Sequence, residues 1–243
     1  MSAEYDRIGV TYSNTRMADP RIAEMIAAAL GDAKSVFNVG AGTGSYEPTD
    51  RDVTAVEPSR KMISQRPVSS APAVCASAEN LPFDNDSFDA AMAVLTIHHW
   101  NDQEKGLEEL KRVARKRVVI LTFDPQARPW PTRYFPELAE LNAQAMLAIG
   151  SLTQLLGASE VRAVPIPHDC QDGFLYSYWR RPEAYLDEEL RSGSSSFWKI
   201  GDVAAGLGDL RQDLQTGDWH RRYCDMLDQD VYDVGYRLVV TEL

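Results

Sequence analysis

Short apolar runs alternate with amphipathic segments through the first half of the chain. The runs that predict strands occupy residues 36–39, 52–58, 71–78, 88–97 and 117–124. Helices are predicted for residues 19–31, 59–66 and 101–115 from apolar spacing and composition. Strands that alternate with helices at this spacing favour βαβ units with right-handed crossovers. The first half is therefore predicted to be a Rossmann-like α/β structure with a parallel sheet.

The alternation stops after Asp124. Residues 125–138 hold four of the thirteen prolines of the chain, residues 138–157 read as one amphipathic helix, and residues 159–167 read as a sixth strand. We expect a single domain with four parts: an N-terminal lid and first helix (1–31), a Rossmann-like core (32–167), a cap insertion rich in aromatic and charged residues (168–230), and a final strand (231–243).

Charge and composition restrict the partners. The 243 residues include 36 acidic and 25 basic side chains, a net charge of −11 that repels nucleic acids and anionic membranes. The start of the chain resembles no signal peptide, and no apolar stretch approaches the roughly 20 residues of a membrane span. Three widely spaced cysteines suit neither disulfides nor a metal site. We expect a cytoplasmic protein that binds no nucleic acid, membrane or metal.

A glycine-rich loop follows the first predicted strand. Gly40, Gly42 and Gly44 give the spacing G-x-G-x-G, which is neither a dinucleotide fingerprint nor a P-loop, so phosphate binding is disfavoured. Glu57 ends the second strand 17 residues after Gly40, where an acid can accept both hydroxyls of a ribose. A nucleoside without a pyrophosphate agrees with both observations.

Four segments in order carry a family resemblance. The segments NVGAGTGS (38–45), AVEPS (55–59), 76–100 and 109–122 resemble the successive motifs of class I S-adenosylmethionine-dependent methyltransferases, in the ubiquinone/menaquinone-methyltransferase-like (type 11) group. The resemblance covers about half of the chain. It implies S-adenosylmethionine as the cofactor and a seven-stranded, mostly parallel sheet with helices on both faces and a helical cap insertion.

The resemblance also implies roles for individual residues. The methionine part of the cofactor would contact the glycine loop and the end of the fourth strand, the ribose would bind an acid, and the adenine would lie between two further segments. The residues for the methionine part are Gly40, Ala41, Gly42 and Leu95. The acid for the ribose is Glu57. The residues for the adenine are Ser59, Met62, Ser77, Ala78 and Glu79.

Two positions depart from the family pattern. Asn38 and Ser77 stand where acidic residues are usual. The Asn38 amide can still orient the loop or the cofactor's ammonium group, because it offers an acceptor and donors. The loss of two charges raises the alternative of a cofactor-binding protein without activity.

Methyl transfer depends mainly on positioning, so candidates for chemistry are few. His98 and His99 follow the fourth strand at the carboxyl edge of the sheet, where one can act as a general base. The alternative is that His98 packs under the cofactor and His99 caps the next helix. Adjacent residues are expected to point in different directions. In the N-terminal segment, Tyr12 is a candidate for the methyl-transfer site and Arg16 for the cofactor carboxylate.

The cap offers less specific candidates. Tyr176, Tyr178 and Trp179, beside Arg180 and Arg181, form either an acceptor-binding wall or the core of the cap itself. His168, next to Asp169, is a second base candidate, and Cys170 lacks an activating group.

Together these features predict a methyltransferase of specialised metabolism that methylates an oxygen or nitrogen of a small molecule or short peptide. C-methylation and cofactor binding without catalysis remain the alternatives. An NAD-dependent oxidoreductase is disfavoured by the G-x-G-x-G spacing and by the lack of a Tyr-x-x-x-Lys pair.

Overall fold

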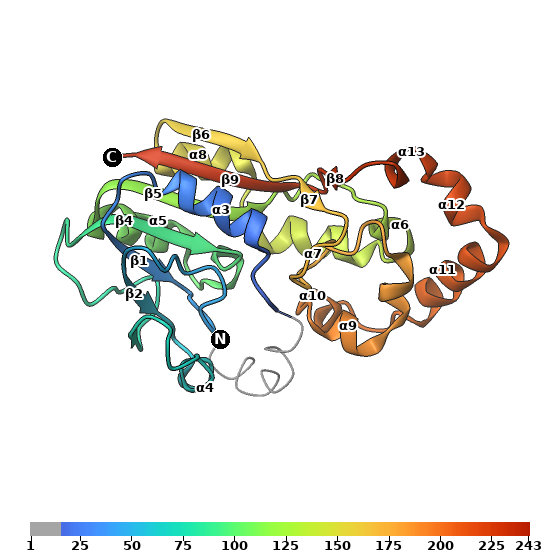
Figure 1. Cartoon of the computed structure of the whole chain (residues 1–243), viewed down its shortest axis with the longest axis horizontal. Coiled ribbons are helices and arrows are strands. Elements are labelled where there is room, and N and C mark those ends of the chain that lie inside the picture. The colour runs from blue at the N-terminus through green and yellow to red at the C-terminus, as the bar shows by residue number, and fades with distance from the viewer. Residues whose placement is uncertain (1–15) are drawn as a thin grey trace.

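A seven-stranded sheet forms the centre of the computed structural model, which describes residues 16–243 (Figure 1). The strand order is β3-β2-β1-β4-β5-β9-β6, and β9 runs antiparallel to both of its neighbours. The strands are β1 (Ser35–Val39), β2 (Asp52–Val56), β3 (Ala73–Val74), β4 (Phe88–Val94), β5 (Ala114–Phe123), β6 (Ser159–Ala163) and β9 (Tyr236–Glu242). The predicted seven-stranded, mostly parallel α/β fold is confirmed.

Both faces of the sheet are covered by helices. Alternate residues of β1, β4 and β5 belong to two separate buried clusters, one on each face. Ile22 and Ile26 of helix α3 (Pro20–Ala29) complete one cluster, while Leu107 of α5 (Gln103–Val113) and Leu152 of α8 (Ile149–Leu156) complete the other. This two-sided burial explains why the strands read as continuous apolar runs.

The predicted helix over residues 138–157 is wrong in its length. It is two helices, α7 (Glu137–Ala145) and α8, separated where Met146 adopts an extended conformation (φ −111°, ψ 138°). Helix α7 contacts α10 (Ser196–Lys199), whereas α8 contacts α5 on the sheet. The two halves therefore pack against different parts of the molecule, which the apolar periodicity alone does not reveal.

The predicted sixth strand also divides in two. β6 pairs with β9, whereas β7 (Ile166–Pro167) pairs with β8 (Val231–Tyr232) in a separate two-stranded sheet. Pro165 lies between them and has no N–H to donate to a ladder. The second sheet thus brings together the two ends of the segment formed by residues 168–230.

The cap, residues 168–230, lies beyond the carboxyl end of β4 (Figure 1). Its helical segments are η2 (Pro182–Leu186), α9 (Glu188–Ser192), α10, α11 (Ala204–Thr216), α12 (Asp218–Arg222) and α13 (Cys224–Leu227). Trp130 packs edge-to-face on Tyr185 and Trp219 of the cap, with 5.1 Å between ring centroids in each pair. Helix α6 (Pro131–Tyr134) contacts α11, so residues before β6 also support the cap.

None of the helices formed by residues 16–243 has the length and apolar character needed to cross a membrane.

Candidate functional site

One cavity of about 210 Å³ opens at the carboxyl ends of β1, β2 and β4, and we call it the cofactor cavity. All twelve residues predicted to bind the cofactor line it: Arg16, Asn38, Gly40, Ala41, Gly42, Glu57, Ser59, Met62, Ser77, Ala78, Glu79 and Leu95. The family resemblance implied this grouping, and the residues at the strand ends meet because parallel strands bring their carboxyl ends to one edge. The individual roles of these residues remain predictions.

Gly40 fixes the turn between β1 and the loop that follows it. Its φ of +68° is left-handed, and a Cβ atom there would lie 1.9 Å from Oγ1 of Thr96. The N–H groups of Gly40 and Ala41 both donate to the carbonyl of Val56, at 2.8 and 3.1 Å. These bonds hold the glycine loop against the end of β2, next to Glu57.

The Glu57 carboxylate joins the two loops of the cavity. Its Oε2 accepts the N–H of Gly42 and its Oε1 accepts the N–H of Ser59, both at 2.9 Å. Burial raises the pKa of Glu57, and the two N–H donors partly oppose that rise. Each carboxylate oxygen can accept a further hydrogen bond, so the geometry suits a pair of vicinal hydroxyls.

Glu79 fixes the opposite wall. Its Oε1 accepts the N–H groups of Asn101 and Asp102 at 2.7 and 3.3 Å. Burial alone would raise the pKa of Glu79, but the N–H groups and the Ser77 hydroxyl lower it overall. The hydroxyl at position 77 thus stabilises the neighbouring carboxylate instead of supplying a charge itself.

Sequence reasoning missed Trp100 in this wall. Its indole lies against Gly106 of α5, where a Cβ atom would come within 2.4 Å of the ring. The Nε1–H is buried and has no hydrogen-bond partner within residues 16–243. A buried indole donor without a partner is expected to meet a ligand acceptor. Only its place directly after the two histidines could have indicated this role.

The Asn38 amide is paired with an acid from the glycine loop, Glu47. Asn38 donates from Nδ2 to Oε1 of Glu47 at 3.2 Å, and Nη2 of Arg66 lies 2.6 Å from Oε2 of the same carboxylate. Arg66 also donates to the Gly42 carbonyl at 3.2 Å. An amide at position 38 is therefore complementary to Glu47, whereas a carboxylate there would face another carboxylate.

We predict that Asn38→Asp destabilises the protein, by about 1–3 kcal/mol at neutral pH, because two buried carboxylates would share one site. Urea unfolding at pH 5 and pH 8 should show the larger loss at the higher pH, where both groups must ionise. The double variant Asn38→Asp/Glu47→Gln restores one acid and one amide, and should recover most of the stability. A single variant as stable as the wild type would contradict this account of position 38.

His98 and His99 lie on a 3₁₀ turn after β4. The predicted strand over 88–97 ends at Val94, because Leu95 has a left-handed φ of +52° and the turn η1 (Ile97–His99) follows. The two imidazoles stack, with 3.9 Å between ring centroids and 46° between planes. The expectation that the adjacent side chains point in different directions is therefore wrong.

Both imidazoles are neutral at neutral pH. Burial lowers the pKa of His98 to about 4, with smaller contributions from the cations Lys199 and Arg16. Burial also lowers the pKa of His99 to well below its usual value, and His98 and the same two cations add to the effect. The pair can accept hydrogen bonds, but each imidazole is a weak base in this environment.

Acid should destabilise the protein through these imidazoles. The unfolded chain binds a proton at the ordinary pKa of 6.5, whereas folded His98 does so only near 4, so stability is lost as the pH falls between these values. Urea unfolding from pH 8 to pH 4 should give a shallower decline for His98→Asn than for the wild type. The surface variant His220→Asn is the matched control. Parallel curves for His98→Asn and the wild type would refute the assignment.

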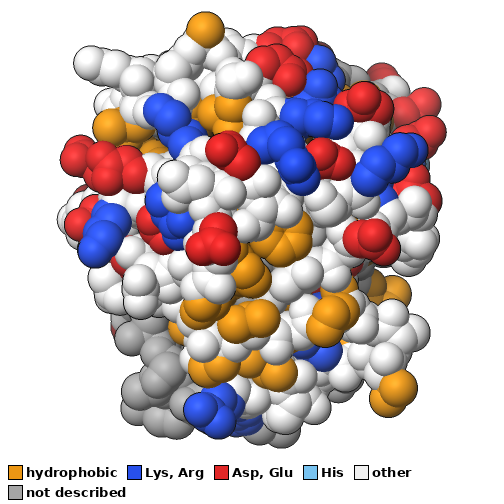
Figure 2. Space-filling model, turned by 90° about the vertical axis from the view of Figure 1, so that its left-hand side faces the viewer, with side chains coloured by type: hydrophobic (Ala, Val, Ile, Leu, Met, Phe, Trp, Pro, Cys, Tyr) orange, Lys and Arg blue, Asp and Glu red, His pale blue; other side chains and the backbone are white. Residues whose placement is uncertain are grey.

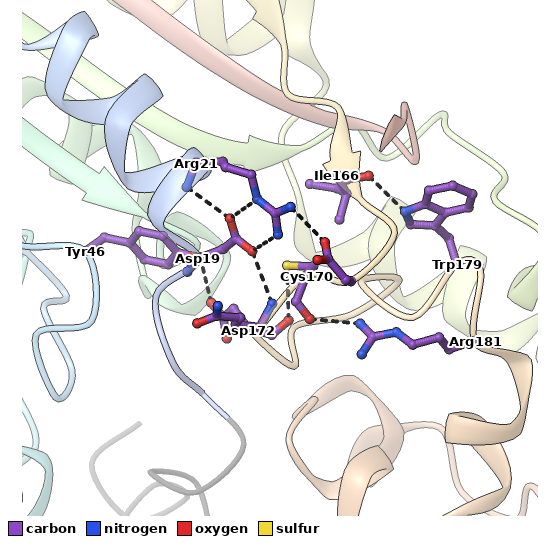
Figure 3. Close-up of polar contacts among 10 residues, drawn as sticks. Asp19, Arg21, Tyr46, Ile166, Cys170, Asp172, Trp179 and Arg181 are labelled. Carbon is purple, nitrogen blue, oxygen red and sulfur yellow. Dashed lines mark hydrogen bonds and ion pairs between the residues drawn. The ribbon is translucent and has the colours of Figure 1, made fainter. Parts of the chain in front are cut away.

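A buried polar network connects the cavity to the cap (Figure 3). Asp172 of the cap is fully buried; its Oδ1 lies 2.6 Å from Nε of Arg16, and its Oδ2 accepts the Tyr46 hydroxyl at 2.9 Å. Tyr46 comes from the glycine loop and lines the cofactor cavity. Asp19, the N-cap of α3, adds a hydrogen bond from the Gln171 N–H at 3.2 Å. Asp172 thus holds together three separate segments.

A second, smaller cavity of about 50 Å³ adjoins the first, and we call it the acceptor cavity. Arg16, Leu95 and His99 line both cavities, while His98 lines only the second. Arg16 therefore lies at the junction of the two cavities. Its predicted role, binding of the cofactor carboxylate, stays a prediction. Tyr12, the third candidate for chemistry, lies outside the described residues.

The aromatic residues of the cap form its core. Tyr176 and Trp179 are fully buried and line neither of these two cavities; Trp179 donates from Nε1 to the Ile166 carbonyl at 2.9 Å. Arg181 lies over the Tyr178 ring and donates to the Cys170 carbonyl at 2.8 Å. Of the two interpretations left open by the sequence, the packing one is confirmed for Tyr176 and Trp179.

The other candidates of the cap are also placed away from the site. His168 lines neither the cofactor cavity nor the acceptor cavity. Burial raises the pKa of the Cys170 thiol to about 12, which leaves it unreactive. Across residues 16–243, no group of three or more histidine, cysteine, aspartate or glutamate side chains gathers in a way that could hold a metal ion.

Comparisons with known proteins agree with the geometry. A family model described as a methyltransferase domain matches residues 37–122. A crystal structure from Anabaena variabilis, described as a "Putative methyltransferase from antibiotic biosynthesis pathway", is 35% identical, with a TM-score of 0.86 over 94% of this chain and 99% of that one.

Two curated relatives match over shorter stretches. The tRNA (carboxymethyluridine(34)-5-O)-methyltransferase alkbh8 of Xenopus tropicalis is 30% identical over 60% of this chain and 25% of its own length. The ubiquinone/menaquinone biosynthesis C-methyltransferase UbiE of Burkholderia vietnamiensis is 30% identical over 45% of this chain and 46% of its own length. The chain thus spans half or less of the length of these relatives. With the fold, the cavity and the near full-length structural match, the chain belongs to the class I S-adenosylmethionine-dependent methyltransferases.

Proposed function

We propose that this protein transfers a methyl group from S-adenosylmethionine to an oxygen or nitrogen atom of a small molecule. The observation that carries the proposal is the pair of adjoining cavities, which share Arg16, Leu95 and His99 in their walls. The larger suits the cofactor of the family. The smaller lies on the side of Phe174 and Ser194 of the cap, where an acceptor would approach the junction.

The residues of the cofactor cavity fit S-adenosylmethionine on two independent observations. Glu57 presents two carboxylate oxygens at the end of β2 for ribose hydroxyls, and Trp100 presents a buried indole N–H that lacks a protein acceptor. When bound, the cofactor supplies a methyl group made electrophilic by its sulfonium.

The chain contributes positioning and water exclusion. Leu95 is held in a strained left-handed conformation between the two cavities by its N–H bond to the Leu121 carbonyl, at 2.8 Å. A fixed apolar side chain at the junction limits the directions from which the acceptor can approach the methyl group. Correct positioning of the two reactants is the main source of acceleration in a displacement of this kind. His98 and His99 are neutral and can accept a hydrogen bond from the acceptor.

Charge favours a small molecule over the tRNA named for one relative. The chain carries a net charge of −11. On the face shown in Figure 2, acidic and basic side chains are interspersed and form no continuous basic surface. Binding of a nucleic acid depends on such a surface. A carbon acceptor, as named for the UbiE relative, is the second candidate, since weak bases suffice where the acceptor carbon is already activated.

The proposal is tested in two steps. Calorimetry with S-adenosylmethionine and S-adenosylhomocysteine measures binding, and failure of both to bind would reject it. Incubation with a small-molecule cell extract then measures S-adenosylhomocysteine formation. Binding without turnover in any extract would favour a cofactor-binding protein without activity.

A further inference from the structure

The acceptor cavity is unusual in its charge. Its walls include Arg16 and the two histidines, but none of the described residues that line it is an aspartate or glutamate. Lys199 at the end of α10 is close enough to lower the pKa of both imidazoles. Asp172 pairs with Arg16 at 2.6 Å but lines neither cavity. The described wall of this cavity therefore holds no carboxylate, in a chain with a net charge of −11, although Asp172 partly offsets the charge of Arg16 from behind.

A buried hydroxyl also lines this cavity. Thr122 of β5 is 1% exposed, and its Oγ1 has no hydrogen-bond partner within residues 16–243. A buried hydroxyl without a partner costs free energy, and a ligand that accepts a hydrogen bond from Thr122 would recover it. Ser194, Ser195 and Ser196 bring further hydroxyls to the same cavity.

These features discriminate between acceptor groups. An amine is protonated at neutral pH; the described wall offers no carboxylate to pair with it, and Lys199 and the sulfonium of the cofactor would repel it. An alcohol or phenol must lose a proton, and the imidazoles are the bases that the described part of the wall offers. A carboxylic acid is already ionised at neutral pH and needs no base.

We propose that the methyl acceptor is a small carboxylic acid, bound as its anion at the junction of the two cavities, and that the product is its methyl ester. This inference rests on the proposed methyltransferase function. Phe123, Met146 and Phe174 give the acceptor cavity an apolar interior. At about 50 Å³ it is smaller than the roughly 150 Å³ that holds a benzene molecule, so the acid carries a short aliphatic body.

The reaction balances without a proton donor or acceptor. A carboxylate oxygen forms a bond to the methyl carbon while the bond between that carbon and sulfur breaks. The electron pair of the broken bond stays on sulfur, which loses its positive charge as the carboxylate loses its negative one. Arg16 and Thr122 act by holding the anion, and the neutral imidazoles stay neutral throughout.

The acceptor class is tested with methyl-labelled S-adenosylmethionine and a small-molecule extract separated into anionic, neutral and cationic fractions at neutral pH. We expect labelled product from the anionic fraction, with the label released as methanol by mild alkali, because esters hydrolyse and ethers, amines and C-methyl groups do not. Alkali-stable product, or label from the other fractions alone, would overturn the carboxylate assignment and leave the methyltransferase function intact. Cofactor binding without label in any fraction would count against both.

Two variants test the wall of the cavity. Thr122→Val keeps the shape and removes the hydroxyl, so kcat/KM with the active fraction should fall about tenfold while the melting temperature stays level or rises. Ser177→Ala, which removes another buried hydroxyl without a partner away from both cavities, is the matched control and should keep full activity. Equal activity in Thr122→Val and the wild type would contradict the role of Thr122.

A readout independent of turnover is the titration of the imidazoles, followed by NMR. Lys199→Met should raise the pKa of His98, because a nearby cation is removed. Butyrate should also raise it, whereas butyramide, which has nearly the same size but no charge, should not. If both compounds shift the pKa of His98 equally, or if neither shifts it, the proposal that this cavity binds an anion is wrong.

Discussion

Replacement of Glu57 by alanine is expected to weaken the binding of S-adenosylhomocysteine by about 1–3 kcal/mol, or roughly 5- to 150-fold. The buried carboxylate offers charge-assisted hydrogen bonds to the ribose, and it also holds the N–H groups of Gly42 and Ser59 at 2.9 Å. Loss of this side chain therefore removes a ligand contact and loosens both loops. Isothermal titration calorimetry measures the change directly.

A matched control separates these effects from the general loss of a carboxylate. Glu109 also accepts a backbone N–H, from Leu81 at 2.9 Å, but it lies on α5 and lines neither cavity. Glu109→Ala should leave the dissociation constant unchanged. If Glu57→Ala binds as tightly as this control, Glu57 does not hold the ribose.

Replacement of Asp172 by alanine is expected to give the largest loss of stability, about 3 kcal/mol. The variant leaves the Arg16 guanidinium and the Tyr46 hydroxyl without the carboxylate that they both contact. Breaking a buried ion pair by removing one partner is costly, because the remaining charge is left in a poorly solvated position. Since Arg16 and Tyr46 both line the cofactor cavity, cofactor affinity should fall as well.

Asp169, three residues earlier, provides the control. It pairs with Arg21 at 2.7 Å, but its side chain is 59% exposed. Asp169→Ala should therefore leave the urea unfolding curve close to that of the wild type. Asp172→Asn, which keeps the shape and loses the charge, should lie between the two. Similar losses for Asp169→Ala and Asp172→Ala would show that the buried network contributes no more than a surface pair.

The sequence predicted the site where the contacts are close along the chain. Glu57 follows Gly40 by 17 residues, and both stand at the ends of strands that the apolar runs define. The parallel sheet then brings the later segments, around Ser77 and Leu95, to the same edge. The motif order therefore grouped ten of the twelve cavity residues, while Arg16 and Met62 lie outside the four motifs.

Other features depend on contacts that no local pattern records. Glu47 looks like an ordinary loop acid in the sequence, and only its contacts with Asn38 and Arg66 explain the amide at position 38. His98 and His99 stack on the 3₁₀ turn that follows the left-handed backbone of Leu95, and apolar periodicity indicates neither feature.

The sequence by itself determined the α/β fold, the glycine loop and the acid that faces it, because periodicity and short-range spacing encode strands, helices and the turns between them. The tertiary structure alone decided how the cap is attached and which residues line the second cavity. Asp172 is 156 residues from Arg16 and 126 from Tyr46, and Thr122 becomes part of a cavity only when the cap covers the sheet edge. Contacts at such separations arise from the packing of whole elements, so they could not be read from the chain before it was folded.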